Sequence, residues 1–213
     1  MRCDKKDLLL YGVTDRSWLG DRTLAQQVEA SLRGGATMIQ LREKHMDRGS
    51  ILAQALELRE LCGRYGVPLI LNDDAELAQA AGADGVHVGQ SDMEAGRVRA
   101  LLGEDKLIGV SARTVEQARA AQAAGADYLG VGAMFPTGTK QDTRPVSYDT
   151  LKAICAAVDI PVVAIGGIGA GNVAELAGSG IAGVAVVSAL YAQPDVEAAT
   201  RSLRAQVERV VGP

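Results

Sequence analysis

The chain has 213 residues, a formal net charge of −4 and three scattered cysteines. A chain of this length can bury one large core, so we expect one domain over residues 1–213, and the acidic balance without a lysine–arginine cluster argues against a nucleic acid partner. The apolar stretches are shorter than a membrane span, and the cysteines form no Cys-x-x-Cys pair, so we predict a soluble, cytoplasmic protein with reduced thiols and no membrane partner.

Short apolar runs alternate with amphipathic segments along the whole chain. Runs with the length of buried strands lie at residues 8–13, 38–41, 68–71, 85–88, 107–110, 128–131, 161–165 and 183–187. Segments with helical apolar spacing lie at residues 24–33, 51–65, 98–102, 115–124, 151–158 and 196–211, and weaker helices are expected after the third and seventh strands. The low aromatic content of 3% favours parallel strands covered by helices of small residues.

An internal repeat supports this count of strands. The segment Ala-Ala-Gly-Ala-Asp occurs at residues 80–84 and at residues 123–127, each time as a helix end and a capping glycine before a buried strand. Consecutive strand–helix units predict the α/β class and a TIM (β/α)8 barrel. A doubly wound sheet is the alternative, although it would need fewer strands. In a TIM barrel the chemistry lies at the C-terminal ends of the strands, so the residues after each strand are the candidates for a site.

The second strand runs into Gln40, Arg42 and Lys44, which the period of two sends to one side. An amide and two cations would then point together. The alternative is a solvent-exposed strand end whose charged residues simply face water. The third and fourth strands are followed by Asp73 and Asp92, which could share a hard cation such as Mg²⁺. Each could instead cap a helix, as we expect for Asp74.

The fifth strand is followed by Ser111, which is equally consistent with a functional hydroxyl and with the start of the helix near Thr114. The two histidines, His45 and His87, are too few and too far apart for a metal cluster, so neither is given a role.

The connection after the sixth strand, residues 132–144, has no apolar period and contains the sequence Thr137-Gly138-Thr139-Lys140. Hydroxyls, a glycine backbone and a positive charge suit a phosphate group. The alternative is a polar connection without a binding role. However, the segment exceeds the usual length of about two to six residues between a strand and a helix.

Glycine turns follow the last two strands, as Gly166-Gly167-Ile168 and as the segment containing Val187-Ser188. This is the common phosphate site of TIM barrels. Residues 169–174 also match the dinucleotide-binding pattern, but the next strand does not end in an acidic residue for the ribose, so a dinucleotide-binding module is the weaker reading.

Seven pieces of sequence at successive strand ends together resemble the thiamine phosphate synthase family. They are Gln40-x-Arg42-x-Lys44, Asn72-Asp73, Val88-Gly89-Gln90-x-Asp92, Ser111, Pro136-Thr137-x-Thr139-Lys140-x-Asp142, Gly166-Gly167-Ile168 and Val187-Ser188. The resemblance implies a TIM barrel enzyme that joins 4-amino-2-methyl-5-hydroxymethylpyrimidine diphosphate to 4-methyl-5-(2-hydroxyethyl)thiazole phosphate and releases pyrophosphate, with Mg²⁺ as cofactor. It also suggests a homodimer.

The resemblance further implies a role for each matching residue. The pyrimidine diphosphate would be bound by Gln40, Arg42, Lys44, Asn72, Ser111 and Lys140, the thiazole phosphate by Thr137, Gly138, Thr139, Gly167, Val187 and Ser188, and Mg²⁺ by Asp73 and Asp92. Arg42, Lys44, Ser111 and Lys140 would be the catalytic set, in which the cations stabilise charge on the leaving group. The alternatives are a thiazole tautomerase with the same barrel and a phosphosugar isomerase or lyase, which do not need paired carboxylates beside three cations.

Overall fold

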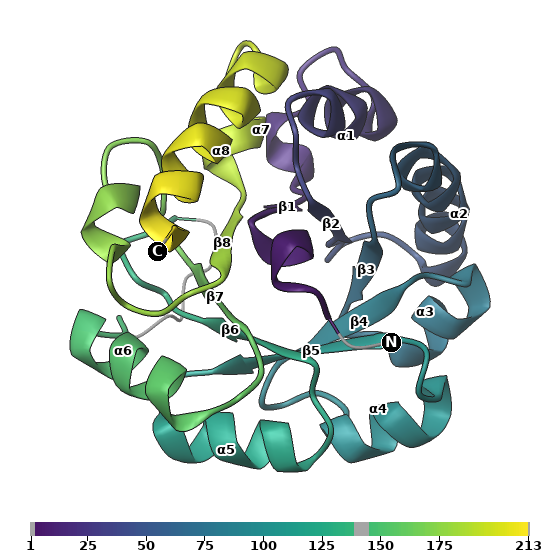
Figure 1. Ribbon diagram of the computed structural model, residues 1–213. Helices are drawn as coiled ribbons and strands as arrows, with labels where there is room; N and C mark the ends of the chain where they lie inside the picture. The colour runs from purple at the N-terminus through teal and green to yellow at the C-terminus, as the bar shows by residue number, and fades with distance from the viewer. Residues whose placement is uncertain (1–2, 139–144, 213) are drawn as a thin grey trace.

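The computed structural model describes residues 3–138 and 145–212. It shows a closed barrel of parallel strands surrounded by helices (Figure 1). The strands are β1 (Leu10–Val13), β2 (Met38–Leu41), β3 (Leu69–Asn72), β4 (Gly85–Val88), β5 (Leu107–Ala112), β6 (Tyr128–Val131), β7 (Val162–Ile165) and β8 (Gly183–Val186). Each strand pairs with the next, and β1 also pairs with β8, with Tyr11 opposite Ala185. This closure confirms the TIM barrel and rules out the doubly wound sheet, in which the edge strands stay unpaired.

The helices are α1 (Leu24–Arg33), α2 (Arg48–Tyr65), α3 (Ala75–Ala81), α4 (Ala95–Leu102), α5 (Val115–Ala123), α6 (Tyr148–Ala157), α7 (Ser188–Tyr191) and α8 (Val196–Val211), with 3-10 helices η1 (Lys5–Leu8), η2 (Arg16–Trp18) and η3 (Val173–Leu176). Several begin earlier than the apolar period predicts because a polar residue caps them. The side chain of Asp47 accepts the N–H of Ser50 in α2, and that of Ser147 accepts the N–H of Thr150 in α6. Asp74 caps α3 as expected.

Several strand boundaries differ from the prediction by one or two residues, and at two places the chain forms a 3-10 helix. The first strand was expected from residue 8, but Leu8 belongs to η1 and β1 starts at Leu10. The weaker helix expected after β7 is the short 3-10 helix η3. In both places apolar residues are buried without strand or α-helix geometry, so burial alone does not determine the element.

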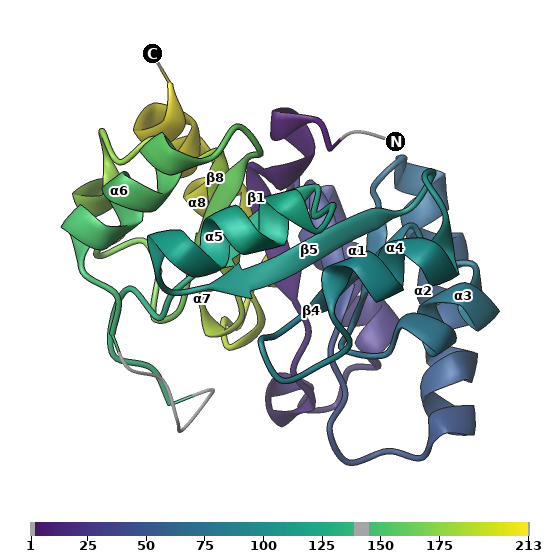
Figure 2. The same ribbon diagram turned by 90° about the horizontal axis from the view of Figure 1, so that it is seen from below.

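The apolar residues form an inner and an outer layer. The inner layer fills the barrel with Leu8, Tyr11, Val13, Met38, Ile70, Leu107, Tyr128, Val163 and Ala185. The outer layer lies between the strands and the helices. Because Leu8 comes from η1, this 3-10 helix closes the N-terminal end of the barrel, the end at which both termini lie (Figure 2). The C-terminal strand ends are therefore the open end.

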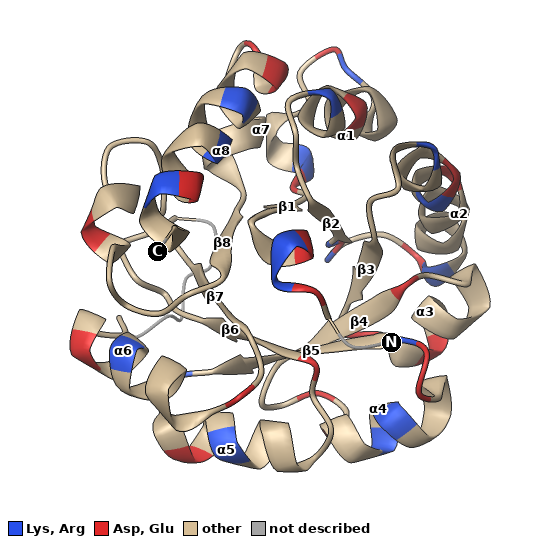
Figure 3. Ribbon diagram, viewed as in Figure 1, with Lys and Arg blue, Asp and Glu red and all other residues tan. Residues whose placement is uncertain are grey.

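Charged residues lie in the helices and connections (Figure 3). None of the eight described strands contains Lys, Arg, Asp or Glu. In the described part of the chain, no helix has the length and apolar character needed to cross a membrane.

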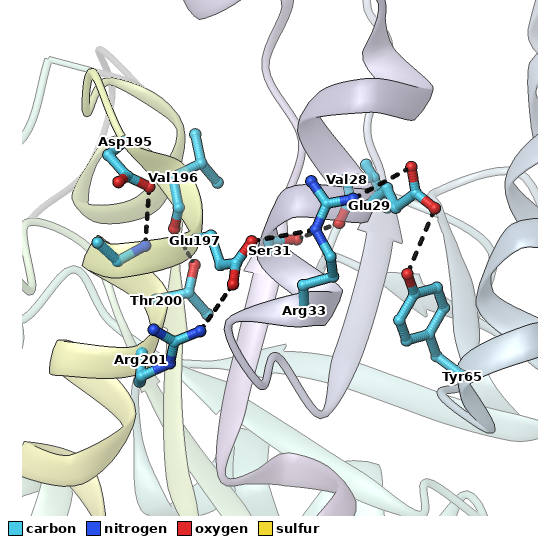
Figure 4. A network of polar contacts seen from close by, with 11 residues as sticks. Val28, Glu29, Ser31, Arg33, Tyr65, Asp195, Val196, Glu197, Thr200 and Arg201 are labelled. Carbon is cyan, nitrogen blue, oxygen red and sulfur yellow. Dashed lines mark hydrogen bonds and ion pairs between the residues drawn. The ribbon is translucent and has the colours of Figure 1, made fainter.

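An ion pair joins the first and last α-helices (Figure 4). Arg33 of α1 lies 3.0 Å from the carboxylate of Glu197 in α8, which in turn lies 2.7 Å from Arg201. The backbones are close here, because a Cβ on Gly34 would come within 2.5 Å of the Glu197 carbonyl oxygen. The close approach of α1 and α8 thus requires a glycine at residue 34, whereas exposed ion pairs contribute little individually.

Candidate active site

One cavity at the C-terminal end of the barrel gathers most of the residues predicted from the sequence. It is lined by Gln40, Arg42, Asn72, Ser111, Thr137, Gly167, Val187 and Ser188. Its volume of about 170 Å³ exceeds by an order of magnitude the ~10–15 Å³ that one water molecule needs on the same measure. The cavity therefore has room for an organic ring.

Five hydrogen-bonding side chains form a continuous network at the floor of this cavity. Gln40 Nε2 donates to the hydroxyl of Tyr11 at 2.7 Å, and that hydroxyl lies 3.0 Å from the hydroxyl of Tyr128. The Tyr128 hydroxyl is 3.2 Å from His87 Nδ1, and His87 Nε2 is 3.0 Å from Ser111 Oγ. We call this chain of contacts, from Gln40 to Ser111, the floor network.

The floor network is assembled from β1, β2, β4, β5 and β6, and glycines make space for it. A Cβ on Gly109 would collide with the ring of Tyr128 and with His87 Nδ1. Burial raises the pKa of both Tyr11 and Tyr128 above its ordinary value, which keeps the two hydroxyls protonated. The floor of the cavity is therefore lined by neutral tyrosine and glutamine groups that can both donate and accept hydrogen bonds.

Ser111 belongs to this network and does not cap a helix. It lies within β5, which continues to Ala112, while Thr114 caps α5 by accepting the N–H of Gln117. The helix-start reading of Ser111 was thus wrong.

Cations lie around the mouth of the cavity. Arg42 is half-buried, and its amide donates to Thr14 Oγ1 at 3.0 Å. The adjacent Glu43 pairs with Arg16 at 2.7 Å, and burial raises the pKa of Glu43 even though Arg16 opposes that shift. Within the described residues, the Arg42 guanidinium has no ion pair. It is therefore available to an anionic ligand.

The sequence also predicted Lys44, Thr139 and Lys140 as phosphate-binding residues. Lys44 is exposed and lies outside the cavity lining. Thr139 and Lys140 lie outside the described residues.

The two predicted metal ligands, Asp73 and Asp92, are exposed carboxylates after neighbouring strands β3 and β4. Asp73 has a φ of +65°, and its amide donates to the carbonyl of His87 at 2.8 Å. The carboxylate of Asp73 accepts from Asn72 Nδ2 at 2.6 Å, and that of Asp92 accepts from the amide of Gly89 at 2.7 Å. A left-handed backbone at an aspartate is uncommon and holds this side chain at the strand end.

Oxygen donors of this kind suit Mg²⁺, which is often held by one or two carboxylates, waters and substrate phosphates. Among the described residues, no group of three or more His, Cys, Asp or Glu could form a complete metal cage. The carboxylates of Asp73 and Asp92 are of the kind that fits Mg²⁺, and an ion held there would need further ligands such as water or phosphate oxygens.

A shallower groove adjoins the cavity beside β7 and β8 and shares Thr137, Gly167 and Ser188 with it. Gly138 and Trp18 also line this groove. Gly167 has a φ of +66°, a conformation that favours glycine.

The turn after Gly167 is fixed by Asn172. Its Oδ1 accepts from the amide of Gly169 and its Nδ2 donates to the carbonyl of Gly167, both at 2.9 Å. Because η3 has only four residues, the dinucleotide-like pattern at residues 169–174 lacks the α-helix that such a site requires.

Three polar side chains of the cavity lining were not predicted to contribute to it. They are Tyr11, Arg113 and His87. A tyrosine in an apolar strand looks like core, and Arg113 lies beyond the predicted end of its strand. The alternation of His87 with Val86 and Val88 was the one available signal, because it places the histidine on the opposite face from both valines.

Comparisons with known proteins point in one direction. The family model described as thiamine monophosphate synthase matches residues 10–190. A thiamine-phosphate synthase of Ruminiclostridium cellulolyticum is 48% identical, covering 93% of this chain and 95% of its own. One from Chloroflexus aurantiacus is 50% identical, covering 94% and 93%. The solved thiamine phosphate pyrophosphorylase from Pyrococcus furiosus superposes with a TM-score of 0.90 at 38% identity, covering 98% of this chain and 99% of that one.

Proposed function

Because the chain belongs to the thiamine monophosphate synthase family, we propose that it joins the pyrimidine diphosphate to the thiazole phosphate and releases pyrophosphate. The family match spans the barrel strands from which the cavity is built. The observation that carries the proposal is the layering of the cavity, with a neutral floor network below and cationic side chains at the mouth. A substrate with an uncharged ring and a charged diphosphate fits this order.

The aminopyrimidine ring would lie on the floor network. Its ring nitrogens and amino group need both donors and acceptors, and Gln40, Ser111 and His87 provide them. Gln40 is only 4% exposed, so its amide is held in one orientation by Tyr11. Such fixed partners reduce the freedom lost on binding and aim the reactive carbon of the substrate toward the mouth.

The diphosphate would then meet Arg42, Lys44 and Lys140, with Asn72 beside them. Negative charge grows on the leaving group as its bond to the ring-bound carbon breaks, and preorganised cations stabilise this charge. The amino group of the ring can delocalise the positive charge left on the carbon. No nucleophilic side chain is needed, and burial raises the pKa of Cys62 to about 12 and that of Cys155 to about 11, so neither thiol is a nucleophile at neutral pH.

Asp73 and Asp92 would hold Mg²⁺ against the same diphosphate. Bound there, the ion would offset charge on the leaving group.

The thiazole phosphate would lie across the groove beside β7 and β8, contacted by Thr137, Gly138, Thr139, Gly167, Val187 and Ser188. Backbone N–H groups at a glycine turn can approach phosphate oxygens closely. Anchoring the phosphate at this end would place the thiazole nitrogen over the reacting carbon, so that proximity supplies part of the rate.

Incubating the purified protein with both substrates and Mg²⁺ tests the proposal directly. We expect thiamine phosphate and pyrophosphate in equal amounts, and no product when either substrate is left out. Absence of product with both substrates present would refute the synthase activity. Conversion of a thiazole isomer without the pyrimidine diphosphate would instead identify a tautomerase.

A further inference from the structure

Arg113 is a second cavity cation to which the site described above gives no role. It lines the same cavity as Arg42 and is half-buried. Its amide donates to Gln117 Oε1 at 2.8 Å, which fixes the backbone at the end of β5. Within the described residues, the guanidinium has neither an ion pair nor a hydrogen bond. A half-buried cation without a counter-charge is costly, and an anionic ligand would compensate it.

The position of Arg113 mirrors that of Arg42. The floor network ends at Gln40 on β2 and at Ser111 on β5. Arg42 and Arg113 each come two residues after one of these network residues, just past the end of the strand. The period of two along a strand places them on the same face as the network residues. Because the C-terminal strand ends form the open end of the barrel, each arginine lies on the mouth side of its network residue.

We propose that Arg113 binds the diphosphate of the pyrimidine substrate, from the β5 side of the cavity, while Arg42 binds it from the β2 side. This inference rests on the proposed function. Arg113 stands above the Ser111 and His87 end of the floor network, where the pyrimidine ring is placed, whereas the thiazole phosphate end is built by β7 and β8. A guanidinium can contact two phosphate oxygens at once, so a pair of them would hold the diphosphate in one orientation.

Binding of the product pyrophosphate, measured by calorimetry with Mg²⁺ present, tests the assignment without requiring turnover. We expect Arg113→Ala to weaken pyrophosphate binding about tenfold or more, because a charge-assisted contact to a phosphate is lost. Arg113→Lys should lose less, since it keeps the charge but not the two-oxygen contact. The matched control is Arg119→Ala, an exposed arginine of α5 outside the cavity, which should bind pyrophosphate as the unaltered protein does.

Steady-state kinetics with each substrate varied in turn complete the test. Arg113→Ala should raise the KM for the pyrimidine diphosphate and leave the KM for the thiazole phosphate unchanged. Unaltered pyrophosphate binding by Arg113→Ala would overturn the inference, and so would a rise confined to the thiazole phosphate KM. Melting curves show whether Arg113→Ala folds normally. If it does not, pyrophosphate binding and the two KM values of Arg113→Lys decide the question. A protein that binds pyrophosphate through Arg113 but makes no thiamine phosphate would refute the proposed function instead.

Discussion

The hydroxyl oxygens of Tyr11 and Tyr128 lie 3.0 Å apart at the cavity floor, and this contact joins the Gln40 half of the floor network to the His87 half. Their rings meet edge to face, with centroids 6.0 Å apart. Both side chains are at most 1% exposed. Tyr11 lines the cavity and Tyr128 does not, so we expect Tyr128 to act through Tyr11 and His87, as a positioning residue.

Tyr128→Phe should lower kcat/KM about tenfold, because it removes the shared hydrogen-bond partner of Tyr11 and His87 at a cost of roughly 1 kcal/mol or more. The matched control is Tyr191→Phe. Tyr191 is also fully buried, and its hydroxyl contacts Ser31 Oγ at 3.3 Å, away from the cavity. We expect a similar small loss of unfolding free energy in both variants and altered kinetics only in the first. Equal kcat/KM values for Tyr128→Phe and Tyr191→Phe would show that Tyr128 is not a positioning residue.

Gly109→Ala should destabilise the fold by about 1–3 kcal/mol, since the added Cβ would collide with the Tyr128 ring and with His87. Gly63→Ala is the control within the same chain. Gly63 is exposed inside α2, and a Cβ there meets nothing within 4 Å, so this variant should gain about 0.5–1 kcal/mol. Urea unfolding of both variants measures the difference. A Gly109 variant as stable as the unaltered protein would mean that the floor network can shift to make room.

Much of the fold was predictable because local signals agreed with burial. The bounds of α1 match the prediction, since its apolar period is framed by the capping box of Thr23 and Gln26. The bounds of α8 match for a similar reason, with Asp195 as the cap. Leu8 could not be assigned correctly from hydrophobicity, because a residue that plugs a barrel is as buried as one in its strands.

The site was predictable where polar residues interrupt an apolar strand and hidden where they do not. Gln40 and Ser111 stand out at strand ends, whereas Tyr11 resembles an ordinary core residue until barrel closure brings Tyr128 to its hydroxyl. Arg113 was missed because the predicted strand ended at residue 110. The continuation of β5 to Ala112 extends the period of two and turns this arginine inward.

Stability at alkaline pH should depend on Cys62. Burial raises the pKa of this thiol from its ordinary value of 9.0 to about 12, with Asp84 adding to the shift. Below pH 9 the thiol is protonated in both states. Between pH 9 and 12 the Cys62 thiol ionises only in the unfolded chain. The free energy of unfolding therefore falls as the pH rises through this window.

Urea unfolding at pH 8 and at pH 10.5 measures this effect. Cys62→Ala should lose about 1–2 kcal/mol less than the unaltered protein between the two values. The folded protein should also react slowly with a thiol reagent at pH 8. Rapid labelling of Cys62 without denaturant would show that the thiol is not held in the protonated state.

Asp92→Asn should abolish most of the turnover while leaving the melting temperature nearly unchanged. The asparagine Oδ1 can still accept the amide of Gly89, so the turn is preserved, but a carboxylate offered to Mg²⁺ is lost. Asp105→Asn, at an exposed position before β5, is the control and should keep full activity. Turnover is followed against Mg²⁺ concentration for both. A normal Mg²⁺ response of Asp92→Asn would remove this residue from the metal site.

Substitutions in the groove beside β7 and β8 and substitutions among the cations of the cavity mouth should affect different substrates. Gly167 is unsuitable for this test, because its φ of +66° disfavours any side chain and a Cβ would come within 2.5 Å of the Pro136 carbonyl oxygen. The exposed Ser188 is the better choice. Ser188→Asp places a carboxylate where the thiazole phosphate is expected, so the KM for the thiazole phosphate should rise far more than that for the pyrimidine diphosphate.

Lys44→Ala should show the opposite preference, with a higher KM for the pyrimidine diphosphate or a lower kcat, since charge on the leaving group grows in the transition state. Ser202→Asp, which adds the same charge on the exposed face of α8, is the control and should leave both KM values unchanged. Initial rates are measured with each substrate varied while the other is saturating. Parallel loss of affinity for both substrates in Ser188→Asp and Lys44→Ala would show that the cavity does not separate the monophosphate from the diphosphate.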